Sequence, residues 1–307
     1  MIRRTHTIYV TLDPFLSPHG AVLHRFDQFL AGLQEQQFPC VWVTGLTRAQ
    51  LDEPRRRLGH NDPFLGESGC GVYLPQDYFH LKGSNTMRLG RFTCIPVAKP
   101  QPAAADALEE LAADLEVTVV SLRSLSPREL CQNTGLRGRE AEQIRMRDFD
   151  ELFFFAGAAE PDVVKFVAEA TVRGLTVQNL GAFWSLSCGA DYAKCIRELG
   201  GLYDRALRHH ALRIGIVADS TGAHSGTSDL KRALTASCDR TLILNERQPA
   251  GRGVGRTESD EDEQAFEGSD SAMAGVNVRS GIRARNEFRL HSPDLWNSLL
   301  ETILERR

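Results

Sequence analysis

The sequence lacks the features that would place the chain in a membrane or on nucleic acid. No stretch of its 307 residues approaches the roughly 20 consecutive apolar residues of a membrane-spanning helix. The formal net charge is −4, whereas nucleic-acid-binding domains usually carry an excess of Lys and Arg. We therefore expect neither a membrane protein nor a nucleic-acid-binding protein.

Cysteine follows no recognisable pattern. The seven cysteines are scattered and odd in number, and none forms a CxxC pair. A disulfide framework or a structural zinc site is therefore not expected, and a reducing cytoplasm is the simplest setting. The opening residues MIRRTH run directly into a strand-like segment and lack the apolar region and cleavage site of a signal peptide. We accordingly expect a cytoplasmic protein.

Buried-type strands followed by amphipathic helices are present, in the order typical of a doubly wound α/β fold. The predicted strands are 7–12, 40–43, 71–74, 212–217 and 241–244, and the predicted helices are 20–36, 47–58, 191–208, 228–236 and 293–304. We therefore predict an α/β core built on a parallel sheet.

The middle of the chain has a different texture. Residues 97–106, VAKPQPAAAD, resemble a hinge into a second unit. That unit should contain helices near 104–114, 126–134, 137–147 and 160–173, and strands near 116–121, 151–156 and 175–179. We predict a discontinuous core, 1–95 and 183–307, interrupted by an α/β cap domain at 96–182. Within the core, the acidic Gly/Ser-rich segment 250–275 should form a flexible loop.

Polar side chains follow three of the predicted core strands. Asp13 comes after the first strand, Thr44 after the second and Asp219 after a late one. The carboxyl ends of parallel strands lie along one edge of a sheet, so these residues could share a crevice and hold Mg²⁺ with a phosphate. A single Asp after a strand is more often a turn or cap residue, but three such ends in order favour a site.

Several segments match one known family in order along nearly the whole chain. They are VTGLTRAQ at 43–50, DPFLGESG at 62–69, TGL at 134–136, RDFDE at 147–151, FW at 183–184 and WN at 296–297. On these residues the chain resembles the haloacid dehalogenase superfamily, and more closely its mannosyl-3-phosphoglycerate phosphatases. The resemblance implies a doubly wound core with an inserted cap. It also implies Mg²⁺-dependent phosphomonoester hydrolysis and a phosphorylated sugar-acid ligand.

The resemblance breaks at the catalytic motifs. The family's first motif is DxDGT, in which the first Asp attacks phosphorus and the second acts as general acid and base. Here Thr11 stands at the nucleophile position, while Asp13 keeps the acid/base position. A neutral hydroxyl is a far weaker nucleophile and a poorer Mg²⁺ ligand than a carboxylate.

Other family positions are altered or uncertain in this chain. Tyr192 stands where the family has a phosphate-neutralising Lys, and Thr44 would donate a hydrogen bond to phosphate. The resemblance would make Asp219, and Asp229 if it replaces the second motif-four carboxylate, metal ligands together with Asp13. Residues at two further positions, Arg48 and Arg147, could bind the sugar acid, although solvated helix faces explain them almost as well.

We therefore expect a mannosyl-3-phosphoglycerate phosphatase-like protein of sugar-phosphate or compatible-solute metabolism, with impaired hydrolysis because of Thr11. The alternative is a non-catalytic binding or regulatory pseudophosphatase. Such a protein could use the acidic loop and the cap as a surface for a protein partner, although a solvated insertion explains the loop more simply.

Overall fold

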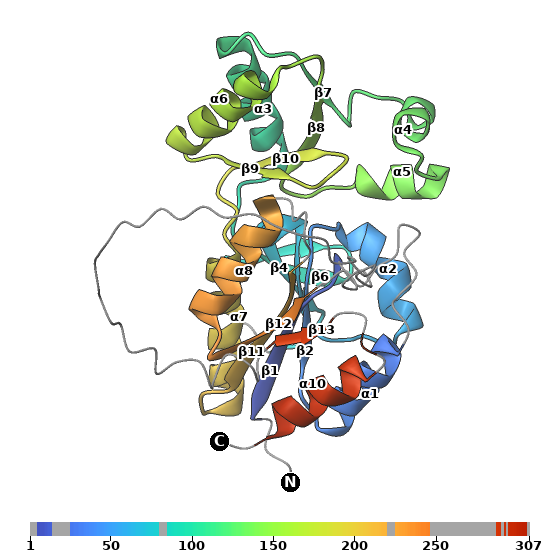
Figure 1. Ribbon diagram of the computed structural model, residues 1–307, viewed down its shortest axis with the longest axis vertical. Coiled ribbons are helices and arrows are strands. Elements are labelled where there is room, and N and C mark those ends of the chain that lie inside the picture. The colour runs from blue at the N-terminus through green and yellow to red at the C-terminus, as the bar shows by residue number, and fades with distance from the viewer. Residues whose placement is uncertain are drawn as a thin grey trace, which may run out of the picture.

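The chain folds into two units, each built around its own sheet. In the computed structural model the described residues are 5–13, 25–79, 85–219, 225–245, 287–289, 292 and 294–305. Side chains of Asp219, residues 225–227 and Arg289 are outside this description. The larger unit contains both ends of the described chain, and the smaller unit sits over one end of it (Figure 1).

The larger unit is a core with a mixed, mainly parallel sheet. Its strands lie in the order β13-β12-β11-β1-β2-β3-β4-β6-β5, parallel from β13 to β3 and antiparallel beyond. Their bounds are β1 (His6–Thr11), β2 (Cys40–Val43), β3 (Phe64–Gly66), β4 (Gly71–Pro75), β5 (Met87–Leu89), β6 (Phe92–Pro96), β11 (Leu212–Asp219), β12 (Arg240–Asn245) and β13 (Glu287–Arg289). Because β1, β2 and β11 are parallel neighbours, their carboxyl ends meet at one edge.

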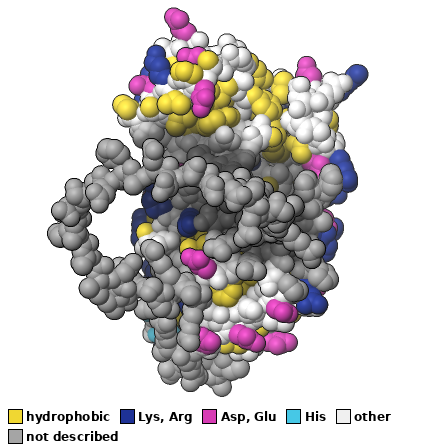
Figure 2. Space-filling model, in the orientation of Figure 1, with side chains coloured by type: hydrophobic (Ala, Val, Ile, Leu, Met, Phe, Trp, Pro, Cys, Tyr) yellow, Lys and Arg dark blue, Asp and Glu magenta, His cyan; other side chains and the backbone are white. Residues whose placement is uncertain are grey.

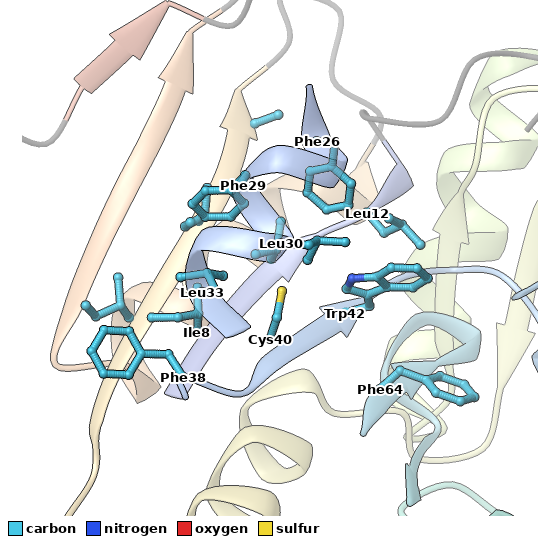
Figure 3. Close-up of a cluster of buried hydrophobic side chains, with 14 of the residues drawn as sticks. Ile8, Leu12, Phe26, Phe29, Leu30, Leu33, Phe38, Cys40, Trp42 and Phe64 are labelled. Atoms are coloured by element: carbon cyan, nitrogen blue, oxygen red, sulfur yellow. The ribbon is translucent and has the colours of Figure 1, made fainter. Parts of the chain in front are cut away.

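Helices cover both faces of the core sheet, because alternate residues of β1 point to opposite faces. Ile8 and Val10 pack with α1 (Phe26–Glu35) and α10 (Leu295–Leu304), and Figure 3 shows this cluster between α1 and the sheet. Tyr9 packs on the other face with α7 (Tyr192–Leu207) and α8 (Ser225–Ser237). Each fully buried large apolar side chain contributes roughly 1.5–3 kcal/mol.

The smaller unit is the cap, a four-stranded antiparallel sheet with helices. The strand order is β7-β8-β10-β9, with bounds β7 (Val119–Ser121), β8 (Glu151–Phe155), β9 (Thr176–Asn179) and β10 (Trp184–Ser187). Its helices are α3 (Gln101–Asp114), α4 (Pro127–Thr134), α5 (Gly138–Ile144) and α6 (Glu160–Val172). Apolar side chains are exposed across the cap in this view (Figure 2). The architecture is therefore that of a doubly wound core with an inserted α/β cap.

The domain limits differ in detail from those expected. Strand β10 pairs with β8 and β9, so the cap sheet reaches Ser187, beyond the limit expected at 182. Strand β6 ends at Pro96, so the expected limit at 95 falls inside the core sheet. The short strands β3, β5, β6 and β13 were not expected, since each has only three to five residues and no sustained alternation.

Helix starts follow local capping. Helix α2 (Arg48–Arg57) begins at a capping box in which Thr47 and Gln50 exchange side-chain-to-backbone hydrogen bonds. Helix α1 is described only from Phe26, later than the expected start at 20, and the acidic segment 250–275 lies outside the described residues. Within the described part of the chain, none of the helices has the length and apolar character needed to cross a bilayer.

Candidate functional site

A cavity of about 330 Å³ lies at the strand-end edge of the core, and cap residues form part of its wall. Its core wall includes Thr11, Asp13 and Tyr192, and its cap wall includes Arg147 and Gln178. Contacts of α2 with α5, and of α8 with β9, hold core and cap together beside it. The volume is at the lower end of the roughly 300–1,000 Å³ of small-molecule pockets.

Thr11 is the last residue of β1, between β2 and β11. It is buried, and its hydroxyl Oγ1 accepts a hydrogen bond from the backbone N–H of Ala218 at 3.3 Å. The hydroxyl therefore takes part in joining two strands. At the end of β1 the structure therefore has a neutral group engaged with the backbone.

Asp13 lies just beyond the strand and is held by the neighbouring turn. Its carboxylate accepts a hydrogen bond from the Thr44 hydroxyl and another from the Gly45 N–H at 2.8 Å. Desolvation by the surrounding protein raises the pKa of Asp13, and the two hydrogen bonds and the charge of Arg147 oppose this rise. Thr44 is buried and does not line the cavity. Its hydroxyl accepts a hydrogen bond from the Leu46 N–H at 3.1 Å and donates one to Asp13, so Thr44 positions the Asp13 carboxylate.

Tyr192 enters the cavity from the first turn of α7. The helix begins at Asp191, whose carboxylate accepts the Lys194 N–H at 2.9 Å. Gly69, with a φ of +87°, allows this close approach, since a Cβ there would lie 2.9 Å from the Tyr192 nitrogen. Burial and the charge of Asp13 raise the pKa of Tyr192, so its hydroxyl stays neutral. Lys194 is exposed and does not line the cavity.

The turn at 67–69 is strained and tied to the cap. Glu67 and Ser68 have φ values of 49° and 58°, a conformation that costs non-glycine residues roughly 1–2 kcal/mol each. The buried Glu67 carboxylate accepts the backbone N–H groups of Asp148 at 2.9 Å and Phe149 at 2.8 Å, at the base of the cap. These hydrogen bonds hold the turn in place, and the turn presents Ser68 to the cavity.

Arg147 lines the cavity, but its guanidinium is engaged. It forms a buried two-point ion pair with Asp150 and donates to the Gly45 carbonyl at 2.8 Å. The hydroxyl of Ser185 also donates to Asp150, at 2.6 Å. Because Gly45 holds Asp13 through its N–H, Arg147 connects the cap to the position of that carboxylate.

The other predicted site residues lie elsewhere. Arg48 pairs with Asp148 at 2.9 Å and does not line the cavity. Asp229 pairs with Arg232 on α8 at 2.8 Å and is likewise absent from the lining, although the next residue, Leu230, is part of it. The Asp219 side chain is outside the described residues. The predicted roles of these residues stay predictions.

The described oxygen donors do not by themselves suit Mg²⁺. Among residues whose side chains are described, no group of three or more His, Cys, Asp and Glu side chains is placed to hold a metal ion. Within the same set, Asp13 is the one carboxylate of the cavity lining, and both its oxygens accept hydrogen bonds. A Mg²⁺ ion usually takes one or two carboxylates in octahedral geometry, and Asp13 alone supplies the smaller number.

Four polar residues of the described cavity lining were not predicted from the sequence: Gln50, Ser68, Gln178 and Asn179. The side-chain oxygen Oε1 of Gln178 and the hydroxyl of Ser68 are buried without a hydrogen-bond partner. Ser68 lies near enough to the Tyr192 phenol to lower its pKa slightly, but not in normal hydrogen-bond geometry. Ser68 falls within a matched motif, whereas Gln178 has no sequence signal beyond being a polar residue in a predicted strand.

Comparisons with known proteins agree with this architecture. No protein-family model matches the sequence. A glucosyl-3-phosphoglycerate/mannosyl-3-phosphoglycerate phosphatase from Methanococcoides burtonii is 24% identical over 201 residues, covering 64% of this chain and 73% of the relative. A protein of the same description from Persephonella marina is 22% identical over 190 residues, covering 61% of this chain and 68% of the relative.

A solved structure shares the fold. The crystal structure of a haloacid dehalogenase-like hydrolase from Bacteroides thetaiotaomicron superposes with a TM-score of 0.50 at 13% identity, covering 78% of this chain and 94% of that one. The sequence relatives and the fold point to the same group. This chain is similar in sequence to mannosyl-3-phosphoglycerate phosphatases and shares the fold of a haloacid dehalogenase-like hydrolase.

Proposed function

We propose that this chain is a mannosyl-3-phosphoglycerate phosphatase-like protein whose phosphoryl transfer is impaired. The observation that carries the proposal is Thr11, whose neutral hydroxyl accepts the Ala218 N–H at the nucleophile position. Removal of a catalytic nucleophile commonly lowers kcat by roughly 10⁴- to 10⁶-fold. Asp13 keeps its place as acid and base, but it has no carboxylate partner among the described lining residues.

The charges of Tyr192 and Arg147 support the same proposal. Phosphoryl transfer is catalysed mainly by positioning and by cations that neutralise the phosphate oxygens. Tyr192 is neutral where the family has a Lys, and the guanidinium of Arg147 is engaged by Asp150. The missing cation should therefore lower turnover further than the missing nucleophile alone does. The effects of the two substitutions on kcat need not be additive.

The relatives' names suggest which ligand to test first. Two are described as glucosyl-3-phosphoglycerate/mannosyl-3-phosphoglycerate phosphatases, so a phosphorylated glycosyl-glycerate is the substrate to assay. Such a ligand would place the chain in sugar-phosphate or compatible-solute metabolism. Phosphatases of this superfamily generally use Mg²⁺, and here Asp13 with Asp219 would be the ligands. Among the residues whose side chains are described, no group of three or more His, Cys, Asp and Glu side chains forms a site for the ion.

Restoring the missing groups tests the proposal. Phosphate release from mannosyl-3-phosphoglycerate would be measured with Mg²⁺ for wild type, for Thr11→Asp with Tyr192→Lys, and for Thr11→Asn with Tyr192→Lys as the matched uncharged control. We expect no release by wild type or the control, and measurable release by the restored protein. Robust wild-type turnover that Asp13→Ala abolishes would overturn the proposal.

A non-catalytic binding or regulatory role is the second candidate. It is favoured by the cavity itself, which is formed between core and cap although its described lining lacks a second carboxylate beside Asp13. A protein of this kind should be stabilised against heat by its ligand without converting it. The predicted surface for a protein partner on the segment 250–275 lies outside the described residues.

A further inference from the structure

The cap sheet ends at strand β7, which has a neighbouring strand on one side. In the order β7-β8-β10-β9, β7 pairs with β8 and forms an outer edge of the sheet (Figure 1). Helix α3 contacts β8 and β10, and α6 contacts β9, so the helices are centred over the other strands. Among the described elements, β8 is the one that contacts β7 extensively. The second edge of β7 is therefore open within the described structure.

Alternate residues of β7 direct their backbone groups to opposite edges of the strand. The Leu122 N–H and the Thr118 carbonyl form hydrogen bonds with β8 and the residue that follows it, at 2.8 and 2.9 Å. In an antiparallel pair, residues one position away from such a bond point their N–H and C=O groups the other way. Val117, Val119 and Ser121 therefore direct theirs to the open edge.

Two of these outward groups are already occupied. The Val117 N–H donates to the Ala112 carbonyl at 3.0 Å, and the Ser121 carbonyl accepts from the N–H of Ser124 at 3.1 Å and from its hydroxyl at 2.7 Å. Among the described residues, the Val117 carbonyl, both backbone groups of Val119 and the Ser121 N–H have no hydrogen-bond partner. An occupant of the edge must match this pattern of free and occupied groups.

A second copy of the same strand matches the pattern. When two β7 strands pair antiparallel with Val119 opposite Val119, these two residues exchange N–H···O=C hydrogen bonds. Each Ser121 N–H then faces the free Val117 carbonyl of the other copy, and the occupied groups face each other. A shift of two residues in either direction leaves a free carbonyl of Val117 or Val119 unpaired. The edge is therefore complementary to itself in one register.

The charges at the two ends of β7 favour the same antiparallel pairing. Glu116 precedes the strand, Arg123 follows it, and both side chains are exposed. Antiparallel pairing about Val119 brings Glu116 of each copy next to Arg123 of the other, and opposite charges across strands are stabilising. Parallel pairing would instead bring like charges together at both ends.

The β7 edge also lacks the protection that other strand edges of this chain have. Edge strands usually avoid pairing through charged side chains, Pro, or a covering helix or loop. Strand β9, at the other edge of the cap sheet, lies against α8 of the core, and β5 of the core sheet contains the exposed Arg88. The sequence of β7 is VVS, which contains neither charge nor Pro.

We propose that two copies of this chain associate through the β7 edges of their caps, about a two-fold axis at Val119. The pairing joins two four-stranded cap sheets into one continuous sheet. Val117, Val119 and Ser121 are not among the described residues that line the cavity, so the inference is independent of the proposed function. Because β7 has three residues, the interface is small and the dimer dissociates on dilution.

Sedimentation velocity of the full chain from about 1 µM to about 1 mM tests the association, since small interfaces dissociate within this range. We expect the weight-average mass to rise from that of one chain toward that of two. A mass that stays at one chain throughout overturns the inference and leaves the edge to an extended segment of another protein. Growth beyond two chains contradicts a closed two-fold pairing.

Substitutions at Val119 test whether β7 is the interface. Val119→Pro removes an outward N–H without breaking a bond to β8, and Val119→Lys places two ammonium groups opposite each other. Each should weaken the dimer by about tenfold or more. Val172→Lys is the control, because Val172 is 81% exposed on α6. Equal thermal midpoints show that the variants fold. Unchanged association in both Val119 variants, or its loss in Val172→Lys, overturns the assignment.

Oxidative cross-linking tests the register. Val119→Cys should give a disulfide-linked dimer, because Cα atoms of directly opposite residues lie about 4.5–5.5 Å apart, within disulfide reach. Val117→Cys is the matched control on the same face of β7. Its two copies are four residues out of register, or roughly 13 Å along the strands. Cross-linking of Val119→Cys above the levels of Val117→Cys and wild type confirms the register, and equal cross-linking overturns it.

Discussion

The hydroxyl of Thr11 accepts a hydrogen bond from the backbone N–H of Ala218, with 3.3 Å between the oxygen and the nitrogen. This contact joins β1 to β11 at the sheet edge where the cavity lies. The side chain of Thr11 is thus part of the hydrogen bonding that joins the core strands. The same relationship predicts that Thr11 contributes to stability.

Replacing Thr11 by Val should destabilise the protein by about 1–3 kcal/mol, because the buried Ala218 N–H would lose its acceptor. Thr11→Ser keeps the hydroxyl and should cost less. Urea unfolding of the three proteins measures the free energies. If Thr11→Val were as stable as wild type, the contact would have no structural value.

Gly69 should be far less tolerant of substitution than another glycine with the same backbone conformation. Gly69→Ala adds a Cβ 2.9 Å from the Tyr192 backbone nitrogen at a φ of +87°. Gly135 also has a positive φ, of +72°, but a Cβ there meets nothing within 4 Å. Both variants pay about 1 kcal/mol for the left-handed backbone, and only Gly69→Ala should lose clearly more in thermal unfolding. Equal losses would show that α7 does not depend on this approach.

Stability should depend on the ionisation of Glu67. Burial and the charge of Asp150 raise the pKa of Glu67 to about 8, against the charge of Arg147 and the backbone N–H of Asp148. The folded state then binds a proton that the unfolded state releases, between about pH 4.5 and pH 8. The stabilisation that this proton gives the folded state is therefore complete below about pH 4.5. The free energy of unfolding then falls as the pH rises toward about 8, by at most about 1.4 kcal/mol per pH unit.

Glu67→Gln isolates the effect in unfolding measurements across this pH range. The wild-type free energy of unfolding should fall relative to that of Glu67→Gln as the pH rises. The comparison is needed because His60 has the opposite effect: burial lowers its pKa to about 3, so stability rises with pH up to its ordinary value near 6.5. A constant difference between the two proteins would contradict a raised pKa of Glu67.

The C-terminal helix should be needed for the core. Trp296 of α10 packs on Phe26 and Phe29 of α1, with 5.1 Å between ring centroids in both pairs. Trp296→Ala should cost about 3–5 kcal/mol in chemical unfolding, as large-to-small changes of buried aromatics do. Leu304→Ala on the same helix, where the residue is 39% exposed, is the control and should cost under about 1 kcal/mol. A small cost for Trp296→Ala would contradict the packing of α10.

The core and one part of the site could be predicted from local patterns. The apolar strands at 7–12, 40–43 and 212–217 were clear because each is short, buried and followed by polar residues. Parallel pairing of β1 with β2 then brought Asp13 and Thr44 together, as expected of strand ends. The sequence did not predict what Thr44 does there. Its hydroxyl donates a hydrogen bond to Asp13, and Thr44 does not line the cavity, where it was expected to donate to phosphate.

Contacts between segments far apart in the chain account for what the sequence did not show. Glu67 meets the backbone of Asp148 across 81 positions, and no local pattern encodes that pairing. The hydrogen bond from Arg147 to the Gly45 carbonyl depends on the cap being folded against the core, across 102 positions of the chain. Gln178 is polar within a cap strand, and its place in the cavity lining depends on how the cap sheet pairs and meets the core.

Phosphate release from mannosyl-3-phosphoglycerate by the purified wild-type chain tests the central claim most directly. Release would be followed with Mg²⁺ present over many enzyme equivalents, beside the Asp13→Ala variant. The account predicts that wild type releases no more phosphate than Asp13→Ala, because Thr11 and Tyr192 supply neither a nucleophile nor a cation. Many turnovers by wild type that Asp13→Ala abolishes would contradict it.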